Sequence, residues 1–312
     1  MSARPLVTVG VPVYQGGDYL DAALRSIREQ TYEHFELIIS DNGSTDGTRA
    51  ICEAHAREDA RVRYHRSDVN RGSSWNFNRL VDLAAGELFK WAGHDDILRP
   101  TYLEHCVAAL AGDPEAVLCQ TGAITIDPHG REVREWPPNP NATAGGPAHR
   151  FADMVLREGP CFPVFGVIRR SALDRTGLLG PYNAHDRPLL AELALHGRFL
   201  HVAQPLFLNR EHPDRSIRAY RGARERIVWF DPAQEGRIVF ANWRLLLEYD
   251  RALRRAAPSA AARARCRLTL LRWALRRAPH LARDVIGGAR AHLRRVRSDP
   301  ERSNRLKVRA RT

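Results

Sequence analysis

The sequence predicts an α/β protein with a mostly parallel central sheet flanked by helices. Buried apolar segments alternate four times with helix-compatible segments in the first 110 residues, which is the pattern of a doubly wound sheet. Polar clusters follow three of the apolar segments, at Tyr14, Asp41 and Asp95. Because the carboxyl ends of parallel strands meet at one edge of a sheet, we expect these clusters to converge on one ligand.

The individual elements have local signatures. The segment 6–14 is apolar and β-branched, and we expect it to end as a strand near Pro12, because proline cannot donate to a ladder. Leu20, Leu24 and Ile27 then follow at helical spacing. Further strands are expected over 35–40, 61–65, 88–92, 117–121, 164–168 and 199–208, and further helices over 75–85, 101–110, 170–175 and 189–196.

Length and composition are those of an ordinary soluble globular protein. The 312 residues accommodate one large α/β domain with an appendage, and 44% of them are apolar. No run of 18 apolar residues and no apolar N-terminal segment is present, so neither a transmembrane helix nor a signal peptide is expected. Five cysteines without a CxxC pair favour a reducing, cytoplasmic compartment and argue against structural zinc.

The positive charge is concentrated near the C-terminus. Residues 251–312 contain 19 Lys and Arg against 3 Asp and Glu, whereas the first 250 residues contain 29 against 33. The segment 218–250 is expected to form two helices broken at Asp231-Pro232, and Arg-rich helical segments follow. Such helices suit peripheral contact with an anionic membrane surface at the inner face of the cell membrane. The alternative is a solvated basic face on helices that pack against the catalytic domain.

Nucleic acid is a less suitable partner for this chain. The body lacks a basic stripe with interleaved aromatic residues, so no nucleic-acid contact is expected. The last ten or so residues are expected to be disordered.

The phosphate-binding motifs of common nucleotide-binding folds are missing. No GxGxxG follows the first strand, and no GxxxxGK[ST] occurs, which disfavours a dinucleotide site and a P-loop. Instead, Asp95 and Asp96 follow the strand at 88–92. Hard oxygen ligands at a strand end suit Mg²⁺ or Mn²⁺ carrying a phosphate. The alternative is a polar loop in which an aspartate caps the next helix.

Taken together, these motifs resemble family 2 glycosyltransferases, which have the Rossmann-like glycosyltransferase-A fold. The resemblance covers residues 6–125 well and residues 160–216 more loosely. The most specific segment is 40–48, Ser-Asp-Asn-Gly-Ser-Thr-Asp-Gly-Thr. The other matching segments are 9–14, 70–86 and 95–100, with Asn78, Ala84 and Gly86 at the spacing of the family.

The resemblance implies roles at a nucleotide-sugar site. Pro12 and Tyr14 would wall the nucleotide base, and Asp41 would accept a hydrogen bond from the edge of the base. Asn78 would belong to the same donor half, and Arg71 would supply positive charge there.

The resemblance also implies a divalent metal, Mn²⁺ or Mg²⁺, on the diphosphate of the donor. Asp95 aligns with the last Asp of the DxD motif of the family and would bind the metal, and Asp96 would orient that site. Gly93 stands where the first Asp of the motif is usual. His212 is a further candidate metal or phosphate ligand, since imidazole is a common ligand, and a structural histidine is the alternative.

Two later segments are candidates for the acceptor side. Asp186, in the segment 180–188, matches the carboxylate that would take a proton from the acceptor hydroxyl, and the alternative is that it only caps the next helix. The segment 127–146 is rich in Pro, Asn and Gly and is expected to be a long surface loop. It is either a tolerated insertion or a lid in which Trp136 stacks on a sugar.

The resemblance therefore implies an inverting glycosyltransferase that moves a sugar from a nucleoside diphosphate to an acceptor hydroxyl in polysaccharide, glycolipid or other glycoconjugate biosynthesis. The acceptor would be a carbohydrate, a lipid-linked or a small molecule. The catalytic domain is expected over 1–216, with a nucleotide half at 1–125 and an acceptor half at 126–216, and a basic helical extension over 217–312. The alternatives are a nucleotidyltransferase and a non-catalytic relative that binds carbohydrate or nucleic acid.

Overall fold

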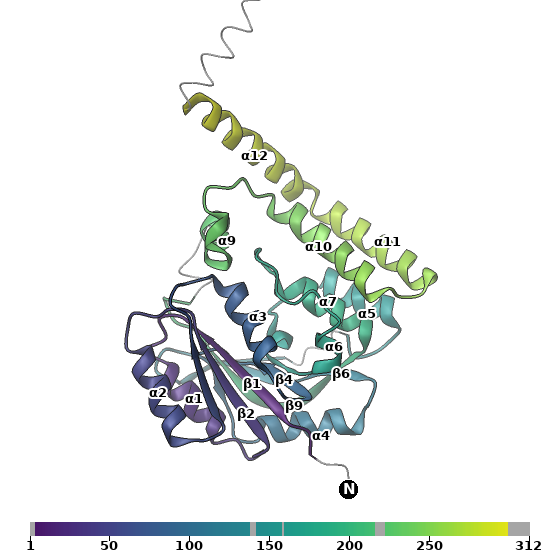
Figure 1. Cartoon of the computed structure of the whole chain (residues 1–312). Coiled ribbons are helices and arrows are strands. Elements are labelled where there is room, and N and C mark those ends of the chain that lie inside the picture. The colour runs from purple at the N-terminus through teal and green to yellow at the C-terminus, as the bar shows by residue number, and fades with distance from the viewer. Residues whose placement is uncertain (1–3, 138–141, 158, 216–221, 299–312) are drawn as a thin grey trace, which may run out of the picture.

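The computed structural model describes residues 4–137, 142–157, 159–215 and 222–298, and it contains one mixed sheet in the order β3-β2-β1-β4-β8-β6-β9-β5, with β7 paired to β6 (Figure 1). The predicted disorder of the last ten or so residues concerns a segment outside the described residues. The strands are β1 (Val7–Val13), β2 (Phe35–Asp41), β3 (Val62–Arg66), β4 (Leu88–Trp91), β5 (Ile97–Leu98), β6 (Ala116–Ile126), β7 (Glu132–Trp136), β8 (Val167–Arg169) and β9 (Arg198–Arg210).

Helices cover both faces of this sheet. The α-helices are α1 (Leu20–Arg28), α2 (Thr48–Glu58), α3 (Ser73–Leu83), α4 (Tyr102–Gly112), α5 (Pro147–Leu156), α6 (Arg170–Leu173), α7 (Asp186–His196), α9 (Ala223–Phe230), α10 (Ala241–Ala256), α11 (Ala260–Arg276) and α12 (Ala278–Ser298). Two short 3₁₀ helices are η1 (Phe162–Phe165) and η2 (Pro232–Gln234).

The first four long strands form the parallel half of the sheet. β1 pairs in parallel with both β2 and β4, and Val13 at its end lies beside Asp41. Successive residues of β2 face opposite cores: Leu37 and Ile39 pack with α1 and α4, whereas Ile38 packs with α3. This arrangement brings the predicted polar clusters to one edge of the sheet.

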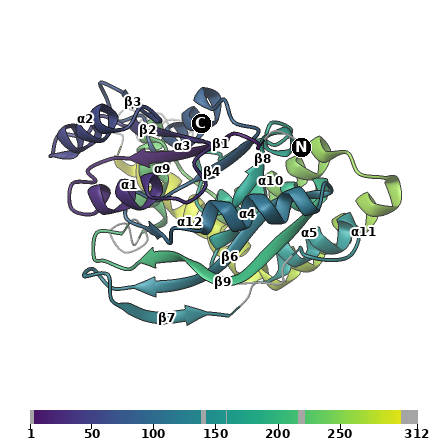
Figure 2. The same cartoon turned by 90° about the horizontal axis from the view of Figure 1, so that it is seen from below.

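The second half of the sheet contains the antiparallel pairs of the predicted mostly parallel sheet. β8 is antiparallel to both β4 and β6, and β6 is parallel to β9. The segment 127–146, expected to be a loop, contains β7, which forms an antiparallel hairpin with β6 (Figure 2). Its residues 132–135 are exposed, so this edge strand carries no apolar signal in the sequence. Residues 138–141 of that segment lie outside the described residues.

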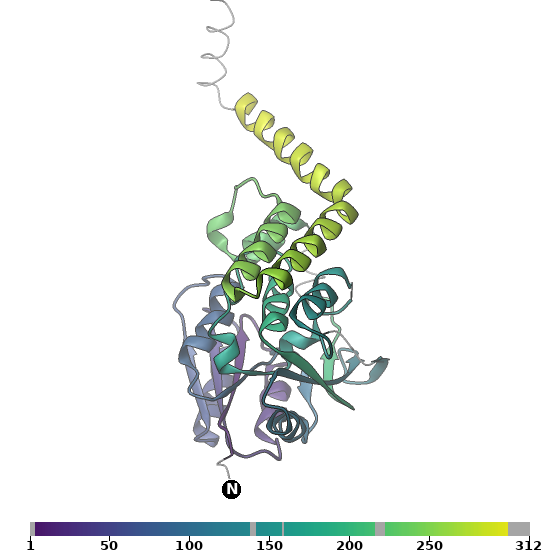
Figure 3. The same ribbon diagram turned by 90° about the vertical axis from the view of Figure 1, so that its right-hand side faces the viewer.

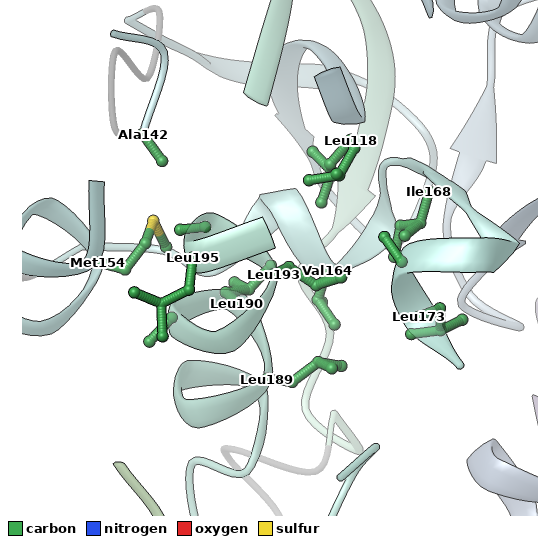
Figure 4. Packing of buried hydrophobic residues seen from close by; sticks show 14 of the residues in the cluster. Leu118, Ala142, Met154, Val164, Ile168, Leu173, Leu189, Leu190, Leu193 and Leu195 are labelled. Carbon is green, nitrogen blue, oxygen red and sulfur yellow. The ribbon is translucent and has the colours of Figure 1, made fainter. Parts of the chain in front are cut away.

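The core on one face of the sheet is centred on α7. Leu189, Leu190 and Leu193 of this helix are each at most 1% exposed, and they pack near Leu118 and Ile168 of the sheet (Figure 4). Burying such a leucine contributes roughly 1.5–3 kcal/mol. Since α7 is buried on nearly every side, it is a rigid base for the loop that precedes it.

The C-terminal helices pack onto this same core. Tyr249 and Leu253 of α10 and Cys266, Leu270 and Trp273 of α11 are buried in it. In contrast, α12 extends away from the sheet (Figure 3). None of the helices that the structure describes is both long and apolar enough to cross a membrane.

A buried ion pair joins α10 to α7. Arg255 Nε and Nη2 each lie 2.8 Å from a carboxylate oxygen of Glu192, which also accepts a hydrogen bond from the Gly177 N–H. The Glu192 side chain is 1% exposed and that of Arg255 is 38% exposed. Loss of the arginine would leave the glutamate charge buried without its cation.

Arg255→Met is therefore expected to lower the free energy of unfolding by about 2 kcal/mol, less than for a fully buried pair because Arg255 is partly solvated. Urea unfolding measures this change. Arg254→Met is the matched control, since Arg254 pairs with Asp250 at the surface and its loss should cost about 0.5 kcal/mol or less. Equal losses of unfolding free energy in the two variants would show that the Glu192–Arg255 ion pair does not stabilise the fold more than a surface pair does.

Candidate active site

A cavity of about 1070 Å³ opens at the carboxyl edge of the parallel strands. Its size is at the upper end of the range of ligand pockets, so it is large enough for an extended small-molecule ligand. Its lining includes six of the residues predicted from the sequence, namely Pro12, Tyr14, Asp95, Asp96, Asp186 and His212. Segments distant in the sequence therefore meet at one site.

The wall formed by Pro12 and Tyr14 is held by the loop after β2. The Gln15 side-chain amide exchanges two hydrogen bonds with Thr45, at 2.9 and 3.1 Å, and the Gly16 N–H donates to Thr48 Oγ1 at 2.9 Å. These bonds explain the dense run of small polar residues in the segment 40–48. Tyr14 is 38% exposed and presents an aromatic face to the cavity.

Asp41, predicted to contact the nucleotide base, is fully buried behind the cavity and is not part of its lining. Its carboxylate accepts hydrogen bonds from the Ser44 N–H and the Tyr64 hydroxyl, both at 2.8 Å, and lies 3.4 Å from Arg66 Nε. Burial and then the Asp41 charge raise the pKa of Tyr64, which keeps its hydroxyl a donor. In this arrangement Asp41 fixes the loop, and its neighbour Asn42 lines the cavity.

Arg71 and Asn78 also lie outside the cavity lining. The Arg71 guanidinium stacks over the Trp75 ring at 4.9 Å. Asn78 exchanges two hydrogen bonds with the backbone of Leu179, at 3.0 and 3.1 Å. Neither residue lines the cavity, and their predicted contacts with a donor stay predictions. Asn78 instead positions the segment that leads to Asp186.

Asp95 and His212 form a close pair in the cavity wall. Asp95 Oδ2 lies 3.0 Å from His212 Nε2, and Tyr19 packs on the imidazole at 4.6 Å. Burial alone would raise the pKa of Asp95, but His94 and the hydrogen-bonded His212 outweigh it and hold the pKa below the ordinary value. This lowering favours the charged form of the Asp95 carboxylate.

The donor atoms of this pair fit a divalent metal. Two adjacent ligands of an octahedral ion, each at about 2.1 Å, are roughly 3 Å apart, which matches the separation of Asp95 Oδ2 and His212 Nε2. No group of three or more His, Cys, Asp and Glu side chains suited to a metal occurs within the described part of the chain. Two protein ligands leave the other positions for water and phosphate oxygens, as is usual for Mg²⁺.

Asp96 is held from β9. Its Oδ1 accepts hydrogen bonds from Asn209 Nδ2 and from the Arg210 N–H, both at 2.9 Å, and Arg210 Nε donates to the Asp95 carbonyl at 2.9 Å. Burial, followed by the charge of Asp95, raises the pKa of Asp96. Asn209 and Arg210 were not predicted, although they form a fourth polar cluster at a strand end.

The structure gives a reason for the glycine at position 93. A Cβ atom there would lie 2.6 Å from Asp96 Oδ2 and 2.8 Å from Asp95 Oδ1. The two carboxylates occupy the space that a side chain would need. An aspartate at position 93 is therefore incompatible with this placement of Asp95 and Asp96.

Gly93→Ala is expected to weaken Mn²⁺ binding by about tenfold, because the methyl group displaces the two carboxylates. Calorimetric titration of Mn²⁺ in the presence of a nucleoside diphosphate measures this affinity. The control is Gly112→Ala, where the added methyl meets open space. Unchanged affinity in Gly93→Ala would show that these carboxylates do not bind the metal.

Asp186 is the first residue of α7, and its neighbour His185 occupies the N-cap position. The Asp186 carboxylate accepts a hydrogen bond from the Arg187 N–H at 3.0 Å, and Pro188 has no N–H to offer a cap. These features disfavour the alternative that Asp186 only caps the helix. Burial and then the Asp186 charge raise the pKa of Cys161, so this neighbouring thiol stays protonated.

His185 is part of the support beneath Asp186. Its ring packs against Phe230 at 4.4 Å, and its Nδ1 lies 2.9 Å from the Gly180 carbonyl and 3.2 Å from Ser74 Oγ. Burial lowers the pKa of His185, which favours the neutral ring. His185 therefore gives Asp186 a neutral, packed support.

Aromatic side chains line the cavity from two further elements. Trp136 of β7 donates from Nε1 to Thr125 Oγ1 at 2.8 Å and packs against Phe162, so it is fixed in the wall. Trp229 and Phe230 of α9 line the cavity as well. The contribution of α9 was not predicted, and the adjacent aromatic pair at 229–230 was the available signal.

Comparison with known proteins identifies the family. The family model described as Glycosyl transferase family 2 matches residues 8–177. A protein of Rickettsia felis named an uncharacterized glycosyltransferase is 32% identical over 136 residues, covering 43% of this chain and 22% of the relative. Glycosyltransferase GlyG of Streptococcus pneumoniae is 35% identical over 99 residues, covering 32% of this chain and 33% of the relative. The matched segments thus span a third or less of these two curated relatives.

Solved structures share the fold over most of the chain. S. aureus TarS 1–349 in complex with UDP-GlcNAc matches with a TM-score of 0.63 and 15% identity, over 91% of this chain and 81% of that one. The mannosyltransferase PcManGT of Pyrobaculum calidifontis, in complex with GDP-Man and Mn²⁺, matches with a TM-score of 0.50 and 21% identity, over 94% and 88% of the two chains. The predicted glycosyltransferase-A fold with a helical C-terminal extension is confirmed, and the chain belongs to glycosyl transferase family 2.

Proposed function

We propose that this chain transfers a sugar from a nucleoside diphosphate donor to an acceptor hydroxyl, with metal assistance and inversion of the anomeric carbon. One observation carries the proposal: the Asp95–His212 pair and the separate carboxylate of Asp186 line the same cavity. We assign catalysis to residues 1–216 and treat residues 217–312 as a basic helical extension.

The relatives support a nucleotide-sugar donor. TarS is described in complex with UDP and with UDP-GlcNAc, and PcManGT with GDP-Man and Mn²⁺. In this chain, Pro12 and Tyr14 offer an apolar and aromatic wall for the base. The diphosphate would then lie toward Asp95 and His212, whose donor atoms suit a metal-bound phosphate.

Asp95 and His212 would hold Mn²⁺ or Mg²⁺, and Asp96 with Asn209 would keep Asp95 in place. When bound, the ion offsets the negative charge that grows on the leaving diphosphate. Because Asp95 and His212 supply only two ligands, donor binding and metal binding are expected to be mutually dependent.

Asp186 would act as the general base. Its carboxylate takes the proton of the acceptor hydroxyl while that oxygen forms a bond to the anomeric carbon. The bond from this carbon to the diphosphate breaks on the opposite side, and the configuration inverts. The rings of Trp136, Trp229 and Phe230 supply flat apolar surfaces on which a sugar acceptor can stack.

The test is to incubate the protein with UDP-GlcNAc or GDP-Man and Mn²⁺ and to measure release of the nucleoside diphosphate, with and without carbohydrate and lipid-linked acceptors. We expect release from one of these donor classes, its loss on chelation with EDTA, and a product of inverted configuration by NMR. Release that is unaffected by EDTA, or retention of configuration, would contradict the mechanism.

A further inference from the structure

Helix α11 has two apolar faces. One face packs on the body through Cys266, Leu270 and Trp273, each at most 7% exposed. The other face carries Leu268, Leu271 and Leu275, which are 47%, 55% and 67% exposed. Helix α11 therefore has a second apolar face, and no other part of the described chain buries it.

The three exposed leucines form one stripe, because residues spaced by three and seven positions lie on the same side of a helix. Arginines flank this stripe on both sides. By helical geometry, Arg265, Arg272 and Arg276 lie on one flank and Arg263 and Arg267 on the other, and all five are exposed. Helix α11 contains no Asp or Glu.

The following helix, α12, also carries exposed apolar residues next to exposed arginines. Val285 and Ile286 of α12 are 50% and 52% exposed, and Arg283 and Arg290 are exposed as well. Asp284, the acidic residue of α12, accepts a hydrogen bond from the backbone N–H of Asn242 at 2.6 Å. Both helices lie on the side of the molecule away from β1, β2 and β3 (Figure 1).

We propose that this face of α11 docks on an anionic lipid surface. The leucines would enter the boundary between head groups and acyl chains, and the flanking guanidinium groups would lie at the level of the lipid phosphates. Basic residues in such positions strengthen binding to acidic lipids additively. This inference does not depend on the sugar-transfer proposal.

Other occupants fit this face less well. A second copy of α11 would bring five more arginines to the contact without a single carboxylate in the helix to compensate them. Nucleic acid would pair with the arginines but leave the leucine stripe in water. An acidic bilayer satisfies both the charge and the apolar area.

Flotation of the full chain with vesicles tests this proposal. We expect binding to vesicles of phosphatidylcholine with 30% phosphatidylglycerol, and at least about tenfold weaker binding to pure phosphatidylcholine. Binding should weaken as salt is raised from about 0.1 to 0.5 M. Equal partition to both compositions, or no binding to either, would overturn the proposal.

Two sets of variants separate the apolar and the charged contributions. The apolar set is Leu268→Gln with Leu271→Gln and Leu275→Gln, and the charged set is Arg265→Gln with Arg272→Gln and Arg276→Gln. Each set is expected to lower the vesicle partition coefficient by at least about tenfold. Thermal unfolding should not change, because the substituted residues are exposed. Both keep the rest of the basic C-terminal segment constant.

Matched controls remove exposed residues of the same kinds elsewhere. They are Val69→Gln with Val133→Gln, and Arg25→Gln with Arg49→Gln and Arg57→Gln, and both should bind vesicles like the wild type. Wild-type binding by the leucine variant would overturn the proposal. So would a concentration-dependent dimer of the wild type that the leucine substitutions abolish, because the stripe would then pair with a second copy.

Discussion

Asp186→Asn is expected to lower turnover by at least about 100-fold while leaving donor binding nearly intact. Asparagine keeps the size and shape of the side chain at the start of α7, but it cannot take a proton from the acceptor hydroxyl. The Asp186 carboxylate accepts hydrogen bonds from the Arg187 N–H and from the Cys161 thiol, and the side-chain oxygen of asparagine can accept them as well, so the substitution should disturb the helix little. Steady-state kinetics and calorimetric titration of the donor measure the two quantities.

The control for Asp186→Asn is Asp174→Asn, which removes an aspartate that pairs with Arg170 outside the cavity. It should retain wild-type turnover. Near-normal turnover of Asp186→Asn would remove Asp186 from the mechanism. A loss of donor affinity as large as the loss of turnover would assign it to donor binding instead.

Asp95→Ala is expected to lower turnover by at least about 100-fold and also to abolish the effect of Mn²⁺ on donor affinity. The substitution removes one of the two side chains that we propose as metal ligands and leaves only His212 of the pair. Turnover is measured at saturating donor, and donor affinity is measured with and without Mn²⁺.

The control for Asp95→Ala is Asp82→Ala, on the exposed side of α3. We expect it to behave like the wild type in both measurements. The two active-site variants differ in a diagnostic way, since only Asp95→Ala should lose the response to Mn²⁺. A variant lacking Asp95 that still binds donor more tightly with Mn²⁺ would move the metal to other residues.

The parallel half of the fold was predictable because its strands are buried on both faces. β1, β2 and β4 are largely apolar in sequence, and polar residues follow at or just after their ends. β7 was missed because its exposed residues alternate without an apolar face, and β5 was missed because it has two residues. The direction of β8 depends on its pairing with β4 and β6, and no local pattern encodes it.

The cavity lining could be predicted where an acidic or imidazole side chain directly follows a strand or begins a helix. Asp95 and Asp186 are such cases, and His212 follows the end of β9. The hydrogen bonds of Asp41 to Tyr64 and of Asn78 to the Leu179 backbone could not be predicted, because these partners become neighbours only through the tertiary fold. A single sequence does not distinguish polar residues that support a site from polar residues that contact the ligand.

The proposed mechanism depends on a division of roles within one cavity, with Asp95 at the donor diphosphate and Asp186 at the acceptor hydroxyl. Calorimetric titration of UDP and GDP into the wild type, Asp95→Ala and Asp186→Asn, each with and without Mn²⁺, tests it most directly. We predict that Mn²⁺ tightens binding of one of these nucleotides by at least about tenfold in the wild type and Asp186→Asn but not in Asp95→Ala. The same nucleotide affinity in all three proteins, with or without Mn²⁺, would contradict the account.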